Sequence, residues 1–235
     1  MTFEKSQTGT RPGLPAYFYP WPGSAHWRGV AALPPGSVLV LDPADGPGRT
    51  VDPRYTEAVE RTRSQTDARV YGYVDTDYGL RPVTEVLDDA RLFQQWYGID
   101  GVFLDRVLPM AEQLDYYATV AGALRQAALE VALNPGQPVM ESPYLALADH
   151  IVVFEGTYDH YLATPFPPSP RGEAVATSWH LVYGVATESA MREVVALARD
   201  RGAGLVFVTD GSMPNPWDRL PAYWTQQVDL LAEAD

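Results

Sequence analysis

Eight short apolar runs, separated mostly by helical patterns, constrain the fold of this chain more than any other feature. Each run is continuously apolar rather than alternating, which is the pattern of a parallel strand buried on both faces. Each run also ends in a polar or aromatic residue. The runs cover residues 15–20, 38–42, 70–75, 101–105, 130–134, 151–155, 180–183 and 205–210. They predict a (β/α)8 TIM barrel, whose functional site lies at the carboxyl ends of the strands.

The chain length of 235 residues fits one such barrel, because barrels of this kind have about 250 residues. We expect one domain over residues 15–235, after a loose, polar lead-in over residues 1–14. Asp52 and Pro53 predict an N-cap and a first helical residue, so a helix should cover 53–66. The other expected helices cover 24–32, 82–97, 110–128, 139–148, 188–201 and 217–233. A further helix is expected after Glu155, and the prolines of 165–170 should end it.

The charge and the residue inventory exclude several classes of function. A net charge of −13 with a single lysine, Lys5, argues against nucleic acid or an anionic membrane as a partner. The absence of cysteine excludes disulfides, thiolate metal sites and a cysteine nucleophile. Residues 1–9 show no signal-peptide pattern, and no apolar stretch approaches the roughly 20 residues that span a bilayer. The sequence therefore predicts a cytoplasmic protein.

Most familiar catalytic motifs are missing from the sequence. Lys5 lies in the lead-in, so no barrel lysine can form a Schiff base, and no nucleophile elbow, phosphate loop or zinc-binding helix motif occurs. The four histidines are scattered, and His180 is interpreted as a hydrogen-bonded structural residue. We therefore expect no metal and no cofactor.

Carboxylates at or just after the strand ends remain as candidates, namely Asp42, Asp75, Asp77, Asp105, Glu155 and Asp210. Glycoside hydrolases typically use two carboxyl groups that face each other across the glycosidic bond. Asp42 and Asp210 could instead cap the helices that follow them. Asp75 and Asp77 form an Asp-x-Asp motif that could bind a metal, although a simple loop is the preferred interpretation.

Aromatic residues crowd the same strand ends, and such rings can stack on the apolar faces of sugars or simply fill the core. They include Tyr17, Tyr19, Trp21, Trp27, Tyr73, Tyr78, Tyr158, Tyr161, Trp179, Tyr183 and Trp217.

A series of short motifs, in order from about residue 15 to 226, resembles the spherulin 4-like family, glycoside hydrolase family 135. The motifs include Tyr19-Pro20-Trp21, 72–81, 101–105, Asn134-Pro135-Gly136, Phe154-Glu155, Thr209-Asp210 and Asn215-Pro216-Trp217-Asp218. The resemblance implies a (β/α)8 barrel and hydrolysis of α-1,4-linked galactosamine or N-acetylgalactosamine polymers. It also implies an Asp-Glu pair after the fourth strand and a Glu after the sixth. Asp105 and Glu155 match, whereas Arg106 stands where the family has the second carboxylate.

The leading hypothesis is an enzyme that acts on a glycosidic or amino-sugar-derived small molecule or oligosaccharide. Glu155 is expected as the acid/base, and Asp105 as the nucleophile or charge stabiliser, held by Arg106; the two roles could be reversed. We expect substrate contacts from Tyr17, Tyr19, Asp75, Asp77, Arg106, Asn134, Tyr183, Asp210 and Trp217. Two alternatives stay open. One is a biosynthetic lyase or isomerase whose Arg106 binds an anionic substrate, and the other is a non-catalytic sugar-binding protein.

The ligand inventory predicts that any activity survives exhaustive chelation. Carboxylates without histidine or cysteine would hold only a weakly bound hard cation. Turnover measured before and after EDTA treatment should be the same. Loss of turnover with EDTA, restored by one divalent metal, would show that Asp75 and Asp77 are metal ligands.

Overall fold

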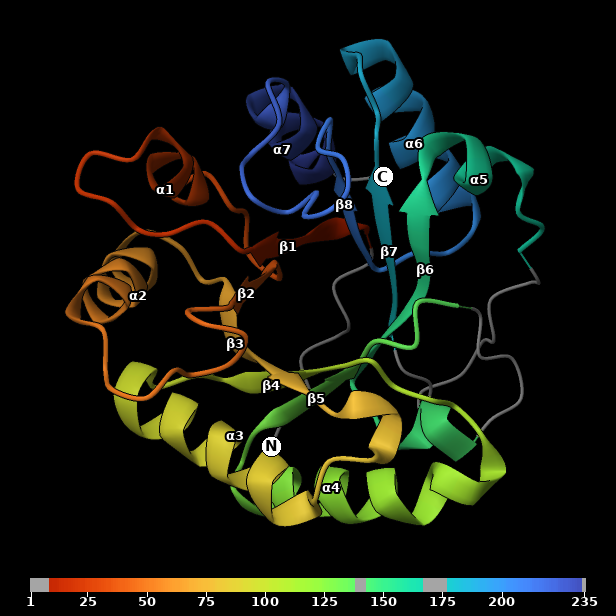
Figure 1. The fold of residues 1–235 in the computed structure, drawn as a ribbon. Helices are drawn as coiled ribbons and strands as arrows, with labels where there is room; N and C mark the ends of the chain where they lie inside the picture. Colours follow the sequence, from red (N-terminus) through yellow and green to blue (C-terminus); the bar gives the residue numbers. More distant parts are fainter. Residues whose placement is uncertain (1–8, 138–142, 167–176, 234–235) are drawn as a thin grey trace, which may run out of the picture.

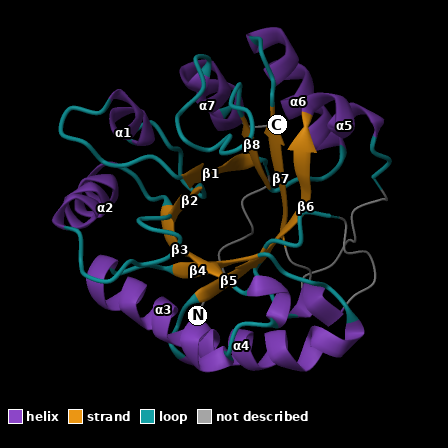
Figure 2. Ribbon diagram, viewed as in Figure 1, coloured by secondary structure: helices purple, strands orange, loops and turns teal. Residues whose placement is uncertain are grey.

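The computed structural model describes residues 9–137, 143–166 and 177–233, and within them the predicted barrel is confirmed. Eight parallel strands pair in sequence order and close into a barrel, with the helices arranged around the ring of strands (Figures 1 and 2). The strands are β1 Arg11–Ala16, β2 Val38–Leu41, β3 Arg69–Asp75, β4 Gly101–Asp105, β5 Glu130–Leu133, β6 His150–Thr157, β7 Thr177–Tyr183 and β8 Leu205–Val208. No helix in these residues is long and apolar enough to cross a membrane.

The helices lie close to the predicted ranges. They are α1 Ala25–Val30, α2 Pro53–Gln65, α3 Val83–Tyr97, α4 Leu114–Gln126, α5 Tyr158–Ala163, α6 Glu188–Asp200 and α7 Trp224–Ala232. Asp52 caps α2 as expected, because its Oδ1 accepts a hydrogen bond from the Arg54 backbone N–H at 2.9 Å. Three 3₁₀ turns cover Asp77–Gly79, Ala111–Gln113 and Pro143–Ala146.

The first strand begins earlier than the sequence pattern predicts. β1 starts at Arg11, so residues 11–14 belong to the barrel and not to a loose lead-in, and the run that ends at Pro20 is mostly the loop after the strand. The sequence pattern does not reveal the start of this strand, because Pro12 and Gly13 are residue types that normally weaken a β-strand. Gly13 is required there, because a Cβ atom would lie 2.3 Å from the Trp179 ring. Trp179 in turn donates its indole N–H to the Gly13 carbonyl at 3.1 Å.

Two helical expectations are also corrected. Residues 217–223 form turns rather than the start of a helix, since Pro221 interrupts the segment and α7 begins at Trp224. In the segment expected to be helical over 139–148, residues 139–142 lie outside the described part, and Pro143–Ala146 form a single 3₁₀ turn. Residues 167–170 of the proline cluster are likewise outside the described part.

Large rings fill the barrel where strand glycines leave room for them. Phe103 and Trp179 pack edge to face with their centroids 5.3 Å apart, and both are buried. On the outer side of the barrel, Gly72 of β3 receives the Phe93 ring of α3, where an added Cβ would lie only 2.5 Å from the ring. The contact between Gly72 and Phe93 fixes the distance between α3 and β3.

Gly72→Ala should therefore destabilise the fold by about 1–3 kcal/mol, the usual cost of overpacking a dense core. Chemical denaturation measures the free energy of unfolding. Gly122→Ala is the matched control, because Gly122 lies within α4 and no atom stands within 4 Å of an added Cβ. The control should be neutral or stabilising by about 0.5–1 kcal/mol. Equal stability of the two variants would contradict this account of helix packing.

Candidate active site

The carboxyl ends of the strands bring the predicted carboxylates to one mouth of the barrel. Asp75 and Asp105 end the adjacent strands β3 and β4 and are register partners. Asn134 directly follows β5, where its backbone N–H donates to the Leu104 carbonyl at 2.8 Å. Glu155 lies in β6. Four consecutive strands thus supply the centre of the site.

Asn134 joins Asp105 to Glu155. Its side-chain Nδ2 donates to Asp105 Oδ1 at 2.7 Å and to Glu155 Oε2 at 2.8 Å. The Gly136 backbone N–H donates to Asn134 Oδ1 at 2.9 Å. That bond identifies the oxygen of the amide, so the nitrogen must face the two carboxylates. One buried amide therefore sets the spacing of the pair.

Two tyrosines complete the surroundings of Asp105. Tyr73 donates its hydroxyl to Asp105 Oδ2 at 3.1 Å, and the Tyr17 ring packs edge to face on Tyr73 with centroids 5.6 Å apart. Burial and the nearby Asp105 carboxylate raise the pKa of Tyr17 well above its ordinary value. Burial and the Asp105 carboxylate also raise the pKa of Tyr73, so both phenols stay protonated. We did not predict Tyr73 as a site residue, although its position two residues before Asp75 on β3 places both on the same face.

Burial raises the pKa of both central carboxyl groups. For Asp105, hydrogen bonds from the Arg106 backbone, Tyr73 and Asn134 oppose the effect of burial, while the Asp75 charge adds to it. For Glu155, hydrogen bonds from Asn134 and Trp217 oppose it, while the Asp105 charge adds to it. Both groups therefore hold a proton to higher pH than a free carboxyl group does, and Asp105 accepts one more hydrogen bond than Glu155.

Asp42, at the end of β2, is a third carboxyl group of the mouth. Burial raises its pKa to about 6, and the charges of Asp45 and Asp105 add to this effect. Its Oδ1 accepts the Gly46 backbone N–H at 2.9 Å. Asp42 is not the cap of the following helix, because Asp52 has that role. The sequence left both interpretations open, and the cap at Asp52 together with the burial of Asp42 distinguishes them.

Arg106 does not hold Asp105, contrary to expectation. Its guanidinium donates to Asp75 Oδ2 at 2.8 Å and to Asp77 Oδ1, and lies 4.8 Å from the centroid of the Tyr78 ring. The left-handed backbone of Arg106, with φ of 53°, turns the chain out of the strand. The side chain thus meets the β3 loop, and Asp105 is bound by Tyr73 and Asn134 instead.

The remaining predicted residues lie at the rim or wall of the mouth. Tyr183 ends β7 and packs edge to face on Trp217 with centroids 6.0 Å apart. Asp210, after β8, forms a 3.5 Å ion pair with Arg219. Tyr19 donates its hydroxyl to Asp52 Oδ2 at 2.8 Å, away from the central pair.

His180 has the structural environment that we expected. It is fully buried, and its Nδ1 lies 2.7 Å from the Tyr161 hydroxyl. Burial lowers the pKa of the imidazole to about 3, so it stays neutral. Within the described ranges, no three histidine, aspartate or glutamate side chains converge as metal ligands.

The fold and site define a (β/α)8 barrel protein with two partly buried carboxylates joined at its mouth. The model of spherulation-specific family 4 (Spherulin4) matches residues 13–231, and the chain belongs to this family. Spherulin-4 of Physarum polycephalum is 28% identical over 93% of this chain and 69% of its own length. The predicted family resemblance is thus confirmed.

Solved structures share the same barrel. Sph3 of Aspergillus clavatus, crystallised in complex with GalNAc, superposes with a TM-score of 0.76 at 23% identity. The comparison covers 97% of this chain and 100% of that one. A chitinase from Chromobacterium violaceum gives a TM-score of 0.53 at 12% identity, over 94% and 99% of the two chains. These likenesses confirm the fold.

The raised pKa of Asp42 predicts a pH-dependent stability. The folded protein holds the proton of Asp42 up to about pH 6, above the ordinary pKa of about 4. The wild type therefore loses stability as the pH rises through about 6. The Asp42→Asn variant has no carboxyl group at this position and therefore lacks this loss. Its free energy of unfolding, relative to that of the wild type, should rise by roughly 2–3 kcal/mol from pH 4 to pH 8. Urea denaturation at both pH values measures this difference. The exposed Asp88→Asn variant is the control, and an identical pH response of the two variants would refute the assignment.

Proposed function

We propose that this protein hydrolyses a glycosidic bond in an amino-sugar-containing substrate, with Asp105 and Glu155 as the working carboxylates. The observation that carries this proposal is the Asn134 amide that joins the two groups. The family membership supports it, and so does the GalNAc bound to the structurally similar Sph3. The aromatic residues Tyr17, Tyr73 and Trp217 around the pair suit the apolar faces of a sugar ring.

The spacing of the pair favours retention of configuration at the anomeric carbon. Both carboxylate oxygens hydrogen-bond to one nitrogen, at 2.7 and 2.8 Å. The two bridged oxygens therefore lie no further apart than about 5.5 Å, which is closer to the carboxyl separation of retaining glycosidases than to that of inverting ones. Such a short spacing leaves little room for a water molecule between the sugar and the second carboxylate, and it favours direct attack.

The hydrogen bonds divide the roles. Asp105 accepts three hydrogen bonds, against two for Glu155, so we assign Asp105 as the nucleophile whose oxygen attacks the anomeric carbon. Glu155 transfers its proton to the glycosidic oxygen as the bond to the leaving sugar breaks. In the second step the Glu155 carboxylate takes a proton from water, and the water oxygen displaces Asp105 from the anomeric carbon. One water molecule is consumed, and both carboxyl groups regain their starting states.

The position of Arg106 weakens the lyase or isomerase alternative. Two donors of its guanidinium are engaged by Asp75 and Asp77, and its face stacks on Tyr78. A substrate anion would have to displace these aspartates. A cleavage assay distinguishes hydrolysis from the non-catalytic alternative, because a sugar-binding protein would bind the same oligosaccharides without cleaving them.

Asp105→Asn and Glu155→Gln should each fold normally and lower turnover of N-acetylgalactosamine oligosaccharides at least about 100-fold, the usual scale for removing a catalytic acid or base. Cleavage rates measured by chromatography test this, and NMR of the fresh product should show the anomeric configuration of the substrate. The matched controls Asp88→Asn and Glu188→Gln change exposed carboxylates on α3 and α6 and should keep full activity. Full activity of either central variant, or an inverted product, would refute the mechanism.

A further inference from the structure

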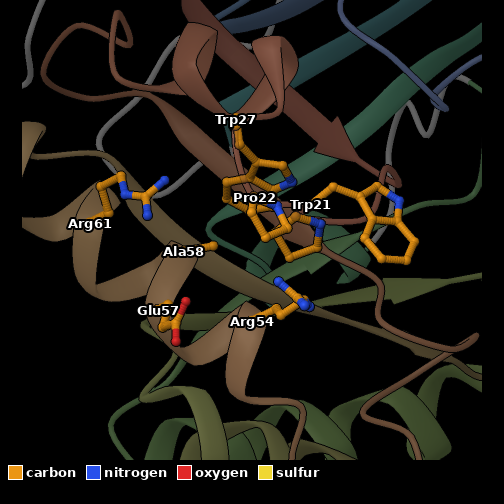
Figure 3. A pocket seen from close by; sticks show the side chains of 9 residues that line it. Trp21, Pro22, Trp27, Arg54, Glu57, Ala58 and Arg61 are labelled. Atoms are coloured by element: carbon orange, nitrogen blue, oxygen red, sulfur yellow. The ribbon is translucent and has the colours of Figure 1, made fainter.

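A second sugar-sized pocket lies beside the mouth, between the loop after β1 and helix α2. It has a volume of about 150 Å³ and is lined by side chains that include Trp21, Trp27, Arg54, Glu57 and Arg61 (Figure 3). A cavity of about this volume accommodates a six-membered ring. None of these residues takes part in the carboxylate site described above.

Trp21 is held in an exposed position by the local backbone. Its side chain is 64% exposed, yet it stands between Pro20 and Pro22, which restrict the chain on both sides. Its N–H donates to the Tyr19 carbonyl at 2.9 Å, and its carbonyl accepts the Ser24 N–H at 2.9 Å. The backbone that carries the exposed ring is thus preorganised, so a ligand that stacks on the ring avoids part of the ordering cost.

Helix α2 supplies both donors and an acceptor to the same pocket. Arg54, Glu57 and Arg61 of α2 line the pocket together with the loop residues (Figure 3). Within the described part of the chain, neither arginine forms an ion pair, although Arg54 lies 5.7 Å from the centroid of the Trp21 ring. Glu57 is exposed, so its carboxylate can accept a hydrogen bond. Sugar hydroxyls both donate and accept, which suits this mixed set better than a purely anionic ligand.

Aromatic residues of the loop after β1 link the pocket to the carboxylate pair. Tyr17 packs on Tyr73, which donates to Asp105. Two residues further along the chain, Tyr19 packs on Trp21 with centroids 4.6 Å apart. The loop therefore runs from the centre of the mouth to the pocket, so an extended chain can follow it.

We propose that this pocket is a distal subsite, in which one neutral pyranose unit of a longer glycan stacks on Trp21 while another unit lies at Asp105 and Glu155. The inference rests on the proposed function and adds a second contact point for its substrate. Arg54 and Arg61 donate to ring substituents, and Glu57 accepts from a hydroxyl group.

The test measures affinity by calorimetry in the Glu155→Gln background, with α-1,4-linked N-acetylgalactosamine oligomers of increasing length. Affinity should rise with length and then level off when the oligomer reaches Trp21. Adding Trp21→Ala or Arg61→Ala should weaken binding of long oligomers about tenfold, the scale of an interface anchor, and leave the shortest ones unchanged. Trp21→Phe should restore part of the loss, because it keeps an aromatic face.

The control for Arg61→Ala is Arg91→Ala, an exposed arginine on α3 paired with Asp88, which should bind all oligomers as the parent does. Long oligomers that bind equally to the parent and the Trp21→Ala variant would overturn the subsite and leave the proposed hydrolysis intact. Failure of every oligomer to bind would overturn both. Equal losses for short and long oligomers would also overturn the subsite, because they would show that Trp21 acts at the central pair.

Discussion

The Asn134 amide is the interaction on which the candidate chemistry depends. Two buried carboxylates without a cation repel each other and resist ionisation, unless neutral donors stabilise the first charge. Asn134 supplies one N–H to each group, and the Gly136 backbone fixes the orientation of the amide. A lysine or arginine in its place would depress both pKa values and leave no acid to protonate a leaving group. A neutral bridge keeps the pair close while allowing one member to stay protonated.

The ion pair next to this bridge keeps its positive charge away from the central pair. Arg106 and its partners Asp77 and Tyr78 all have left-handed backbones, with φ of 53°, 45° and 58°. Such conformations in residues other than glycine cost of the order of 1–3 kcal/mol each. The bonds of Arg106 to Asp75 and Asp77, together with its stacking on Tyr78, offset part of that cost. The arginine thus neutralises the loop after β3 and leaves Asp105 to its neutral donors.

The sequence predicted the barrel and which side chains meet at its mouth, because strand ends can be recognised from apolar runs. Asp105, Asn134 and Glu155 each follow or end such a run, and the closed sheet brings them to one mouth. Tyr73 was missed because it lies inside a run, where an aromatic ring also serves as core. The direction of Arg106 depends on its positive φ, and the start of β1 depends on the contact between Gly13 and Trp179. Both are tertiary effects that no local pattern encodes.

The opposite end of the barrel shows why residue types alone could not locate the site. There, Tyr71 donates to Glu130 Oε2 at 2.6 Å, and Arg69 donates to both oxygens of Glu130, at 2.8 and 3.3 Å. This tyrosine and carboxylate resemble Tyr73 and Asp105 in composition. However, the Glu130 carboxylate is ion-paired with Arg69 and about one-third exposed, so its charge is already balanced. Asp105 and Glu155 have only neutral side-chain donors. Under the proposed function, that difference leaves a proton available for transfer, whereas the ion-paired Glu130 stabilises the bottom of the barrel.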